Sequence, residues 1–211
     1  MTQPLDAYLT PLPLIAVLRG IPPDEVPEIS DVLVEAGFRV LEVPLNSPRP
    51  FESIALLARR QGDRCLTGAG TVRDPRDVSR IREAGGQLVV MPHADLRVVA
   101  EAKRQDMIAL PGVATPTEAF AALDAGADGL KMFPAEALPP PVLKAWRAVL
   151  PASSLVFPVG GIRPDTMAGY WAAGASGFGT GSNLYKPGAA AADVASVARA
   201  FAAAFRALPP R

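Results

Sequence analysis

The chain has 211 residues, of which 49% are hydrophobic and 20% charged, and its 21 basic residues balance its 21 acidic ones. This size and composition predict one globular domain over residues 1–211 and exclude a disordered chain. The zero net charge offers no general attraction to nucleic acid or to an anionic membrane, and no apolar run approaches the ~20 residues of a membrane span, so we expect neither partner.

Strands and helices are predicted in regular alternation. Short apolar runs predict strands at about 14–18, 39–43, 65–70, 88–91, 107–110, 128–133, 155–159 and 177–180. Helices are predicted after them at about 24–36, 50–60, 74–84, 94–104, 115–125, 140–149, 164–173 and 189–207. Two of these have clear start signals, Asp74 before Pro75 and Thr115 before Pro116 with Glu118 at the third helical position. The pattern predicts an α/β protein, a (β/α)8 TIM barrel, with a short capping helix before Leu14.

An Ala-Gly pair recurs at the end of four predicted helices. The pairs are Ala36-Gly37, Ala84-Gly85, Ala125-Gly126 and Ala173-Gly174. Glycine suits the left-handed residue that ends a helix and turns the chain back toward the next strand. This recurrence supports the barrel, while a doubly wound open sheet is the competing architecture.

Lys131 lies inside an apolar strand, whereas Lys103, Lys144 and Lys186 lie in polar or loop-like surroundings. A poorly hydrated amine loses part of the advantage of its charged form, so its pKa falls and the neutral amine becomes available to attack a carbonyl. The alternative is a strand lysine that extends its head group to water.

Glu42 is the corresponding acid, because it lies inside the apolar run at 40–44. In a barrel the C-terminal strand ends surround one cavity, so Glu42 and Lys131 are both candidates to face it. Burial raises the pKa of a carboxyl group toward neutrality, where it can transfer protons in both directions. A structural ion pair between Glu42 and Lys131 is the alternative.

The other candidate residues follow the ends of further strands. Gly160-Gly161 and Gly181-Ser182 follow the seventh and eighth strands, where such barrels commonly bind phosphate through backbone N–H groups; ordinary turn glycines are the alternative. The guanidinium of Arg19 suits a carboxylate or a phosphate, and Thr71 can donate a hydrogen bond to a carboxylate.

Single histidine and cysteine residues exclude several other kinds of site. His93, the only histidine, is expected to be a loop residue, and no metal-ligand spacing is visible. Cys65, the only cysteine, excludes an internal disulfide and is expected to be a small buried hydrophobic residue. A lone cysteine, together with a start that lacks signal-peptide features, predicts a cytoplasmic protein.

Longer motifs are spread along nearly the whole chain, at 13–20 (PLIAVLRG), 42–48 (EVPLNSP), 68–72 (GAGTV), 111–112 (PG), 131–134 (KMFP), 160–162 (GGI) and 181–185 (GSNLY). Through them the sequence resembles the class I aldolases of 2-keto-3-deoxy-6-phospho sugar acids. The resemblance implies that Lys131 forms the Schiff base and that Glu42 is the acid/base. It also implies that Arg19 and Thr71 hold the pyruvyl end of the substrate, and that the loops with Gly160, Gly161, Gly181 and Ser182 hold its phosphate. It implies no cofactor, no metal ion, and a homotrimer.

Within this family, the substrates differ at C4, with galactonate or gluconate configuration. The motif at 42–48 resembles the galactonate branch, as does Val159, where the gluconate branch is expected to carry threonine. Valine cannot bond a C4 hydroxyl, and the loss of such a bond shifts discrimination by ~1–3 kcal/mol. The segment 134–136 is closer to the gluconate branch, so the same reaction on the gluconate epimer, or on both epimers, is the alternative.

The implied reaction begins when neutral Lys131 attacks the C2 ketone of a phosphorylated keto sugar acid and, with the help of Glu42, forms an iminium. The C3–C4 bond then breaks, releasing D-glyceraldehyde 3-phosphate and later pyruvate. Two rivals remain: a barrel isomerase with Glu42 as base and Lys131 as electrostatic support, and a non-catalytic binder of phosphorylated sugar acids.

Overall fold

Parallel strands alternate with helices throughout residues 3–210, which are the residues described by the computed structural model. The strands are β1 (Leu14–Val17), β2 (Val40–Pro44), β3 (Leu66–Gly70), β4 (Leu88–Val90), β5 (Ile108–Leu110), β6 (Gly112–Val113), β7 (Leu130–Met132), β8 (Val156–Pro158) and β9 (Phe178–Thr180). The α-helices are α1 (Val26–Ala36), α2 (Pro50–Gln61), α3 (Pro75–Glu83), α4 (Leu96–Arg104), α5 (Pro116–Asp124), α6 (Pro140–Arg147), α7 (Met167–Ala172) and α8 (Ala191–Arg206). Three short 3-10 helices are η1 (Leu5–Tyr8), η2 (Pro23–Glu25) and η3 (Ala135–Ala137).

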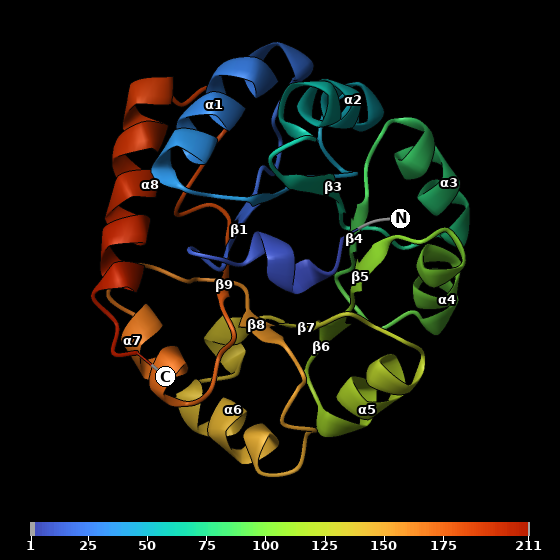
Figure 1. Cartoon of the computed structure of the whole chain (residues 1–211), viewed down its shortest axis with the longest axis vertical. Helices are drawn as coiled ribbons and strands as arrows, with labels where there is room; N and C mark the ends of the chain where they lie inside the picture. The colour runs from blue at the N-terminus through green and yellow to red at the C-terminus, as the bar shows by residue number, and fades with distance from the viewer. Residues whose placement is uncertain (1–2, 211) are drawn as a thin grey trace.

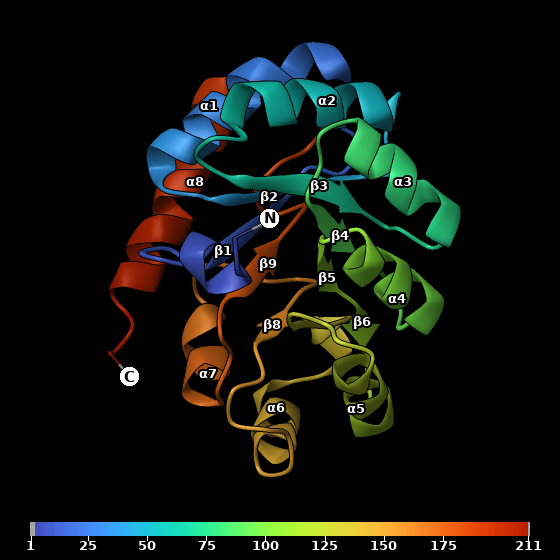
Figure 2. The same cartoon turned by 45° about the vertical axis from the view of Figure 1, so that its right-hand side comes forward.

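The strand order follows the order of the chain. One sheet has the order β5-β4-β3-β2-β1-β9 and a second has the order β6-β7-β8. Pro111 alone separates β5 from β6, and Val159 forms a parallel bridge with Gly179 between the ends of β8 and β9. A doubly wound sheet would reverse its strand order at a switch point, so that alternative is wrong. Figures 1 and 2 show the strands curled inside a ring of helices.

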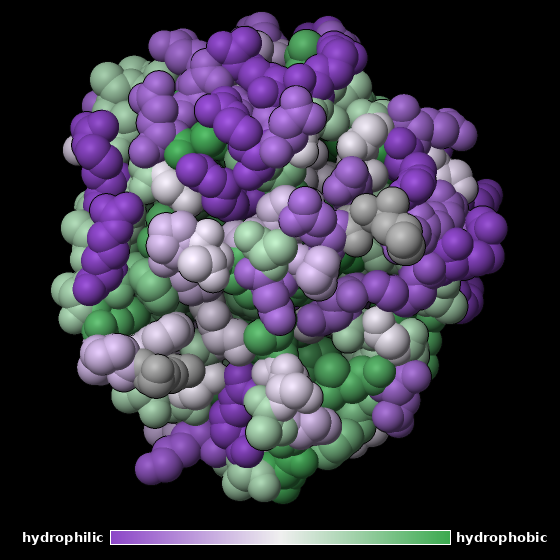
Figure 3. Space-filling view, in the orientation of Figure 1, coloured by the Kyte–Doolittle hydropathy of each residue, from purple (hydrophilic) through white to green (hydrophobic). Residues whose placement is uncertain are grey.

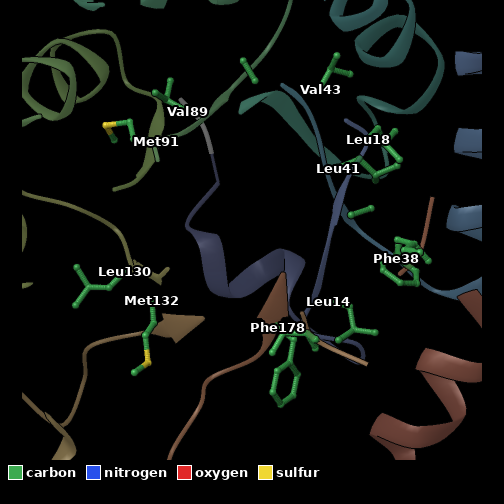
Figure 4. Packing of buried hydrophobic residues seen from close by; sticks show 14 of the residues in the cluster. Leu14, Leu18, Phe38, Leu41, Val43, Val89, Met91, Leu130, Met132 and Phe178 are labelled. Atoms are coloured by element: carbon green, nitrogen blue, oxygen red, sulfur yellow. The ribbon is translucent and has the colours of Figure 1, made fainter. Parts of the chain in front are cut away.

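Side chains on each strand alternate between two apolar clusters. The outer cluster joins strands to helices and includes Leu41, Leu130 and Met132 (Figure 4). The inner cluster lies among the strands and contains Leu5, Ile15, Val40, Leu66, Leu88, Val90, Ile108, Leu110 and Phe157. Because neighbouring side chains of a strand point to opposite faces, Glu42 shares the inner face with Val40, and Lys131 points away from the face of Leu130 and Met132. The two ionisable side chains therefore both point inward.

The N-terminal segment covers one end of the curled sheet. Leu5 of η1 is buried in the inner cluster beside the first residues of β2, β3 and β4. Figure 1 shows η1 across the middle of this end, and Figure 3 shows the same face filled by side chains, hydrophilic over α1, α2 and α3 and more hydrophobic toward α5 and α6. The opposite end, where the strands finish, remains available for a site. Within residues 3–210 no helix combines the length and the apolar character needed to cross a membrane.

Most helix boundaries follow the predicted signals. The glycines of the four Ala-Gly pairs all have left-handed φ angles, 110° at Gly37, 87° at Gly85, 91° at Gly126 and 108° at Gly174, as predicted. Asp74 caps α3 by accepting a hydrogen bond from the N–H group of Arg76. A complete capping box formed by Thr115 and Glu118 starts α5.

Several helices begin later than predicted, among them α1 at Val26 and α8 at Ala191, and for α7 and α4 the structure shows why. α7 begins at Met167 instead of residue 164, because the Thr166 hydroxyl accepts from the N–H group of Arg163 and donates to its carbonyl, which holds a turn there. α4 begins at Leu96, because the carboxylate of Asp95 caps it by accepting from the N–H group of Arg97. The short β6 and η3 were not predicted.

Candidate active site

A cavity of about 590 Å³ lies at the C-terminal ends of β1, β7, β8 and β9. Seven residues predicted from the sequence line it: Arg19, Lys131, Val159, Gly160, Gly161, Gly181 and Ser182. Two further predicted residues, Glu42 and Thr71, do not line it but interact with residues that do, Glu42 electrostatically with Lys131 and Thr71 through a hydrogen bond with Arg19. The structure therefore brings most of the predicted site to one place.

Lys131 lies in the buried part of this cavity, with only 5% of its surface exposed. Burial lowers the pKa of its amine, the charge of Glu42 raises it in part, and the charge of Arg19 lowers it further. Its Nζ lies 4.7 Å from the centroid of the Phe133 ring, a weakly favourable position for a cation. An amine in this setting reaches its neutral, nucleophilic form at lower pH than a hydrated lysine does. It does not extend into bulk water, so that alternative is wrong.

Glu42 is the buried acid beside the cavity, with 1% of its surface exposed. Burial raises its pKa to about 7, while the positive charges of Lys131 and Arg19 act in the opposite direction. Its Oε2 has no hydrogen-bond partner, and among residues 3–210 no ion pair joins it to Lys131. The alternative of a structural ion pair is therefore wrong, and the carboxyl group can hold or release a proton near neutral pH.

Gly70 provides the space for this carboxyl group. It pairs with Pro44 in the β2–β3 ladder, on the inner face of β3. A Cβ atom at position 70 would lie 1.9 Å from Oε2 of Glu42, so a larger residue would displace the acid. The glycine in this strand is thus explained by close approach of a side chain, without a special backbone angle.

Arg19 lines the cavity and is bound by two residues that do not line it. Nη1 of Arg19 donates to Oδ1 of Asn46 at 2.8 Å, and Nη2 donates to Oγ1 of Thr71 at 3.5 Å. Thr71 has a φ of 56°, which is a strained backbone conformation for a β-branched residue. The guanidinium is thus oriented by the loops that follow β2 and β3. Asn46 was part of a predicted motif but was not predicted as a site residue.

The glycine pair after β8 lines the cavity in a left-handed conformation. Gly160 has a φ of 108° and Gly161 a φ of 64°. Cβ atoms would lie 2.3 Å from Oε2 of Glu136 at position 160 and 2.6 Å from its Cγ at position 161. Both angle and space therefore require glycine, which lets the backbone approach a ligand. After β9, the carbonyl of Gly181 accepts hydrogen bonds from the N–H groups of Leu184 and Tyr185, so Ser182 lies in a tight turn.

Sequence reasoning missed several residues of the cavity wall. Phe133, Glu136, Asn183, Tyr185 and Lys186 line it without having been predicted as site residues. Each follows a predicted residue by one to five positions, and this proximity was the available signal.

The remaining sequence predictions concern residues outside this cavity. His93 is exposed in a loop, as predicted, and does not line the cavity. Cys65 is buried just before β3, and burial raises the pKa of its thiol to about 11. In the described part of the chain, no three His, Cys, Asp or Glu residues are grouped in a way that could hold a metal ion.

Two known proteins with similar sequences, and the family model that matches the chain, are named as aldolases. The family model described as "KDPG and KHG aldolase" matches residues 5–200. A Rhizobium meliloti protein named "Probable 2-dehydro-3-deoxy-6-phosphogalactonate aldolase" is 46% identical over 93% of this chain and 92% of its own length. The Escherichia coli "2-dehydro-3-deoxy-6-phosphogalactonate aldolase" is 45% identical over 94% of this chain and 97% of its own.

Solved structures of related proteins are similar to this chain in fold and in sequence. One named "Native KDPGal structure" is 45% identical, with a TM-score of 0.92 over 94% of this chain and 97% of the other. A Legionella pneumophila KDPG aldolase, solved with pyruvate captured as a covalent carbinolamine intermediate, is 27% identical with a TM-score of 0.80 over 90% and 93% of the two chains.

Proposed function

Because the chain belongs to the KDPG and KHG aldolase family, we propose that it is a class I aldolase that cleaves 2-dehydro-3-deoxy-6-phospho-D-galactonate to pyruvate and D-glyceraldehyde 3-phosphate. One observation carries this proposal: a buried amine with a lowered pKa lies in a cavity beside a buried acid whose pKa is about 7. A Schiff-base enzyme needs this combination, because its amine must attack a ketone and its acid must move protons in both directions.

The first half of the reaction builds an electron sink. Neutral Nζ of Lys131 attacks C2 of the substrate and forms a carbinolamine, and the C2 oxygen leaves as water after it has gained a proton from Glu42. Because Glu42 does not line the cavity, this proton passes through a water molecule. The product of this step is an iminium ion between Lys131 and the substrate.

The second half breaks a carbon–carbon bond. The C4 hydroxyl loses its proton, again through a water molecule, to the carboxylate of Glu42, the C4–O bond becomes a carbonyl, and the electrons of the C3–C4 bond move into the iminium to form an enamine. D-glyceraldehyde 3-phosphate leaves, C3 of the enamine gains the proton that Glu42 took from the C4 hydroxyl, and water hydrolyses the new iminium to release pyruvate. Arg19 and Thr71 hold the substrate carboxylate, while the loops of Gly160-Gly161 and Gly181-Ser182 hold the phosphate.

The galactonate configuration at C4 is favoured over the gluconate one. Val159 lines the cavity, and its side chain can form no hydrogen bond with a C4 hydroxyl. Discrimination based on one such bond is worth ~1–3 kcal/mol, so the gluconate epimer remains the alternative substrate.

The proposal also covers the architecture of the chain, its oligomeric state and its location. The chain is a single-domain (β/α)8 barrel, since β5 and β6 read as one strand interrupted by Pro111, and the Val159–Gly179 bridge joins β8 to β9. It assembles as a homotrimer, supported by exposed apolar side chains at Phe120, which is 39% exposed, and Val149, which is 58% exposed. Its location is cytoplasmic.

Reductive trapping tests the chemistry. Sodium borohydride with pyruvate should inactivate the enzyme and leave an adduct on Lys131 that mass spectrometry can locate. Lys131→Arg should prevent both the adduct and pyruvate release, while Lys144→Arg, at an exposed lysine of α6, should prevent neither. Active enzyme without an adduct would favour the isomerase alternative, and ligand binding without pyruvate release would favour a non-catalytic binder.

A second assay separates the two substrates. Lactate dehydrogenase reports pyruvate release continuously, so kcat/KM can be measured for the galactonate and the gluconate epimer with the same enzyme. A higher kcat/KM for the gluconate epimer would overturn the proposed configuration and leave the Schiff-base chemistry intact.

A further inference from the structure

Glu25 binds a loop that is distant from it in the sequence. The hydroxyl of Tyr185 donates a hydrogen bond of 2.6 Å to its Oε2. The N–H group of Gly188 lies 3.2 Å from Oε1 and 3.3 Å from Oε2 of the same carboxylate. One side chain between β1 and α1 therefore holds two points of the loop after β9.

These two points flank Lys186 and Pro187. Tyr185 is buried, with 3% of its surface exposed, so its position is fixed by packing as well as by Glu25. The ring of Pro187 lies against Gly20, where a Cβ atom would approach it to 2.7 Å. Glu25 holds Tyr185 and Gly188, which lie on either side of Lys186 and Pro187, and Pro187 packs on the loop after β1. The backbone of Lys186 therefore has little freedom.

Lys186 lines the cavity at the end formed by the loops after β8 and β9. The same end contains Glu136, whose carboxylate lies against Gly160 and Gly161. The other cations that line the cavity are Arg19, which bonds the loops after β2 and β3, and Lys131, which is buried. A phosphate at this end would therefore meet neutral donors and a carboxylate unless Lys186 supplied positive charge.

We propose that Lys186 is the cationic contact of the substrate phosphate and that Glu25 is the residue that positions it. This inference rests on the proposed aldolase function, and it adds two residues to the site that recognises the phosphorylated end. Lys186 acts as a binding residue. Glu25 touches no substrate and acts only through the loop at 185–188.

Aldehyde selectivity in the synthetic direction tests the role of Lys186. Pyruvate is condensed with D-glyceraldehyde 3-phosphate or with D-glyceraldehyde, which has no phosphate, and KM and kcat are measured for each. Lys186→Met should raise the KM for the phosphorylated aldehyde roughly 10-fold, the effect of one lost charge-assisted contact, and change the KM for D-glyceraldehyde less than about twofold. An equal change for both aldehydes, or no change for either, would overturn the role. Lys144→Met is the matched control.

A double-mutant cycle tests the role of Glu25. Glu25→Ala should raise the KM for D-glyceraldehyde 3-phosphate, and Glu25→Gln, which keeps one acceptor oxygen for Tyr185, should recover part of the loss. In the Lys186→Met background, Glu25→Ala should change this KM almost no further, because the lysine that Glu25 positions is absent. Fully additive effects would overturn the positioning role.

Borohydride trapping of pyruvate on every variant separates this inference from the proposed function. Trapping that survives in the variants shows an intact Schiff-base site and attributes a changed KM to the phosphate end. Absence of trapping in the unaltered protein would overturn the aldolase proposal, and the inference with it.

Discussion

The substitution Glu42→Gln tests the buried acid through the stability of the protein. Burial raises the pKa of Glu42 from 4.5 to about 7, so the folded protein binds this proton more tightly than the unfolded chain does. The resulting stabilisation is fully present below the unfolded pKa of 4.5 and is lost as the pH rises through 7. Glutamine has nearly the same shape and carries no ionisable proton.

The size of the effect follows from the pKa difference. Each pKa unit corresponds to about 1.4 kcal/mol, so ionised Glu42 costs about 3 kcal/mol in free energy of unfolding at high pH, and roughly 2 to 3 kcal/mol of this develops between pH 5 and pH 8. The loss of the Glu42 charge also lowers the pKa of Lys131 further, which makes the variant more stable as the pH rises. Both effects predict that Glu42→Gln gains stability relative to the unaltered protein as the pH increases.

Urea denaturation at several pH values between 5 and 8 measures this difference. The exposed Glu35 of α1 supplies the control, because Glu35→Gln should give a stability profile parallel to that of the unaltered protein. In the aldolase assay, Glu42→Gln should lower kcat by about 10²- to 10⁴-fold, as expected for a lost acid/base group. If the stability profiles of Glu42→Gln and the unaltered protein stay parallel across this range, the raised pKa is refuted.

Three further substitutions have distinct expected outcomes. Gly70→Ala places a Cβ atom 1.9 Å from Oε2 of Glu42, so it should cost about 1–3 kcal/mol in urea denaturation and lower kcat; a fully active, equally stable variant would contradict this packing. Val159→Thr adds a hydroxyl to the cavity wall and should shift the ratio of kcat/KM toward the gluconate epimer by ~1–3 kcal/mol, whereas an unchanged ratio would remove Val159 as a specificity residue. Thr115→Ala breaks the capping box with Glu118 and should lower the free energy of unfolding by about 1 kcal/mol with kcat unchanged; no loss of stability would show that the cap is redundant.

Local signals predicted most of the fold. Apolar runs located the main strands, and the Ala-Gly pairs located four helix ends, because both depend on residues that are adjacent in the sequence. The short β6 could not be predicted in the same way, since its strand character comes from the pairing of Gly112 with Lys131. The late start of α7 depends on a side-chain turn at Thr166 that competes with the first helical turn.

The candidate site was predicted where chemistry and strand position coincide. Lys131 and Glu42 stand out because an ionisable residue inside an apolar strand is uncommon, and alternation along the strand then points both side chains inward. The position of Lys186 gave no such signal, because it depends on contacts between the loop after β9 and Glu25, 160 residues away from Tyr185 in the chain. The absence of an ion pair between Glu42 and Lys131 gave no sequence signal either, because it depends on the distance between the two side chains in the folded protein.

η1, with Leu5 buried in the inner cluster, covers the end of the curled sheet opposite the cavity. The substrate and the products of the proposed reaction therefore enter and leave at the end where the strands finish. In the proposed reaction the aldehyde carries the phosphate, and the pyruvate-derived fragment stays covalently bound to Lys131. The aldehyde therefore leaves through that end first, because pyruvate is released only when water hydrolyses its bond to Lys131.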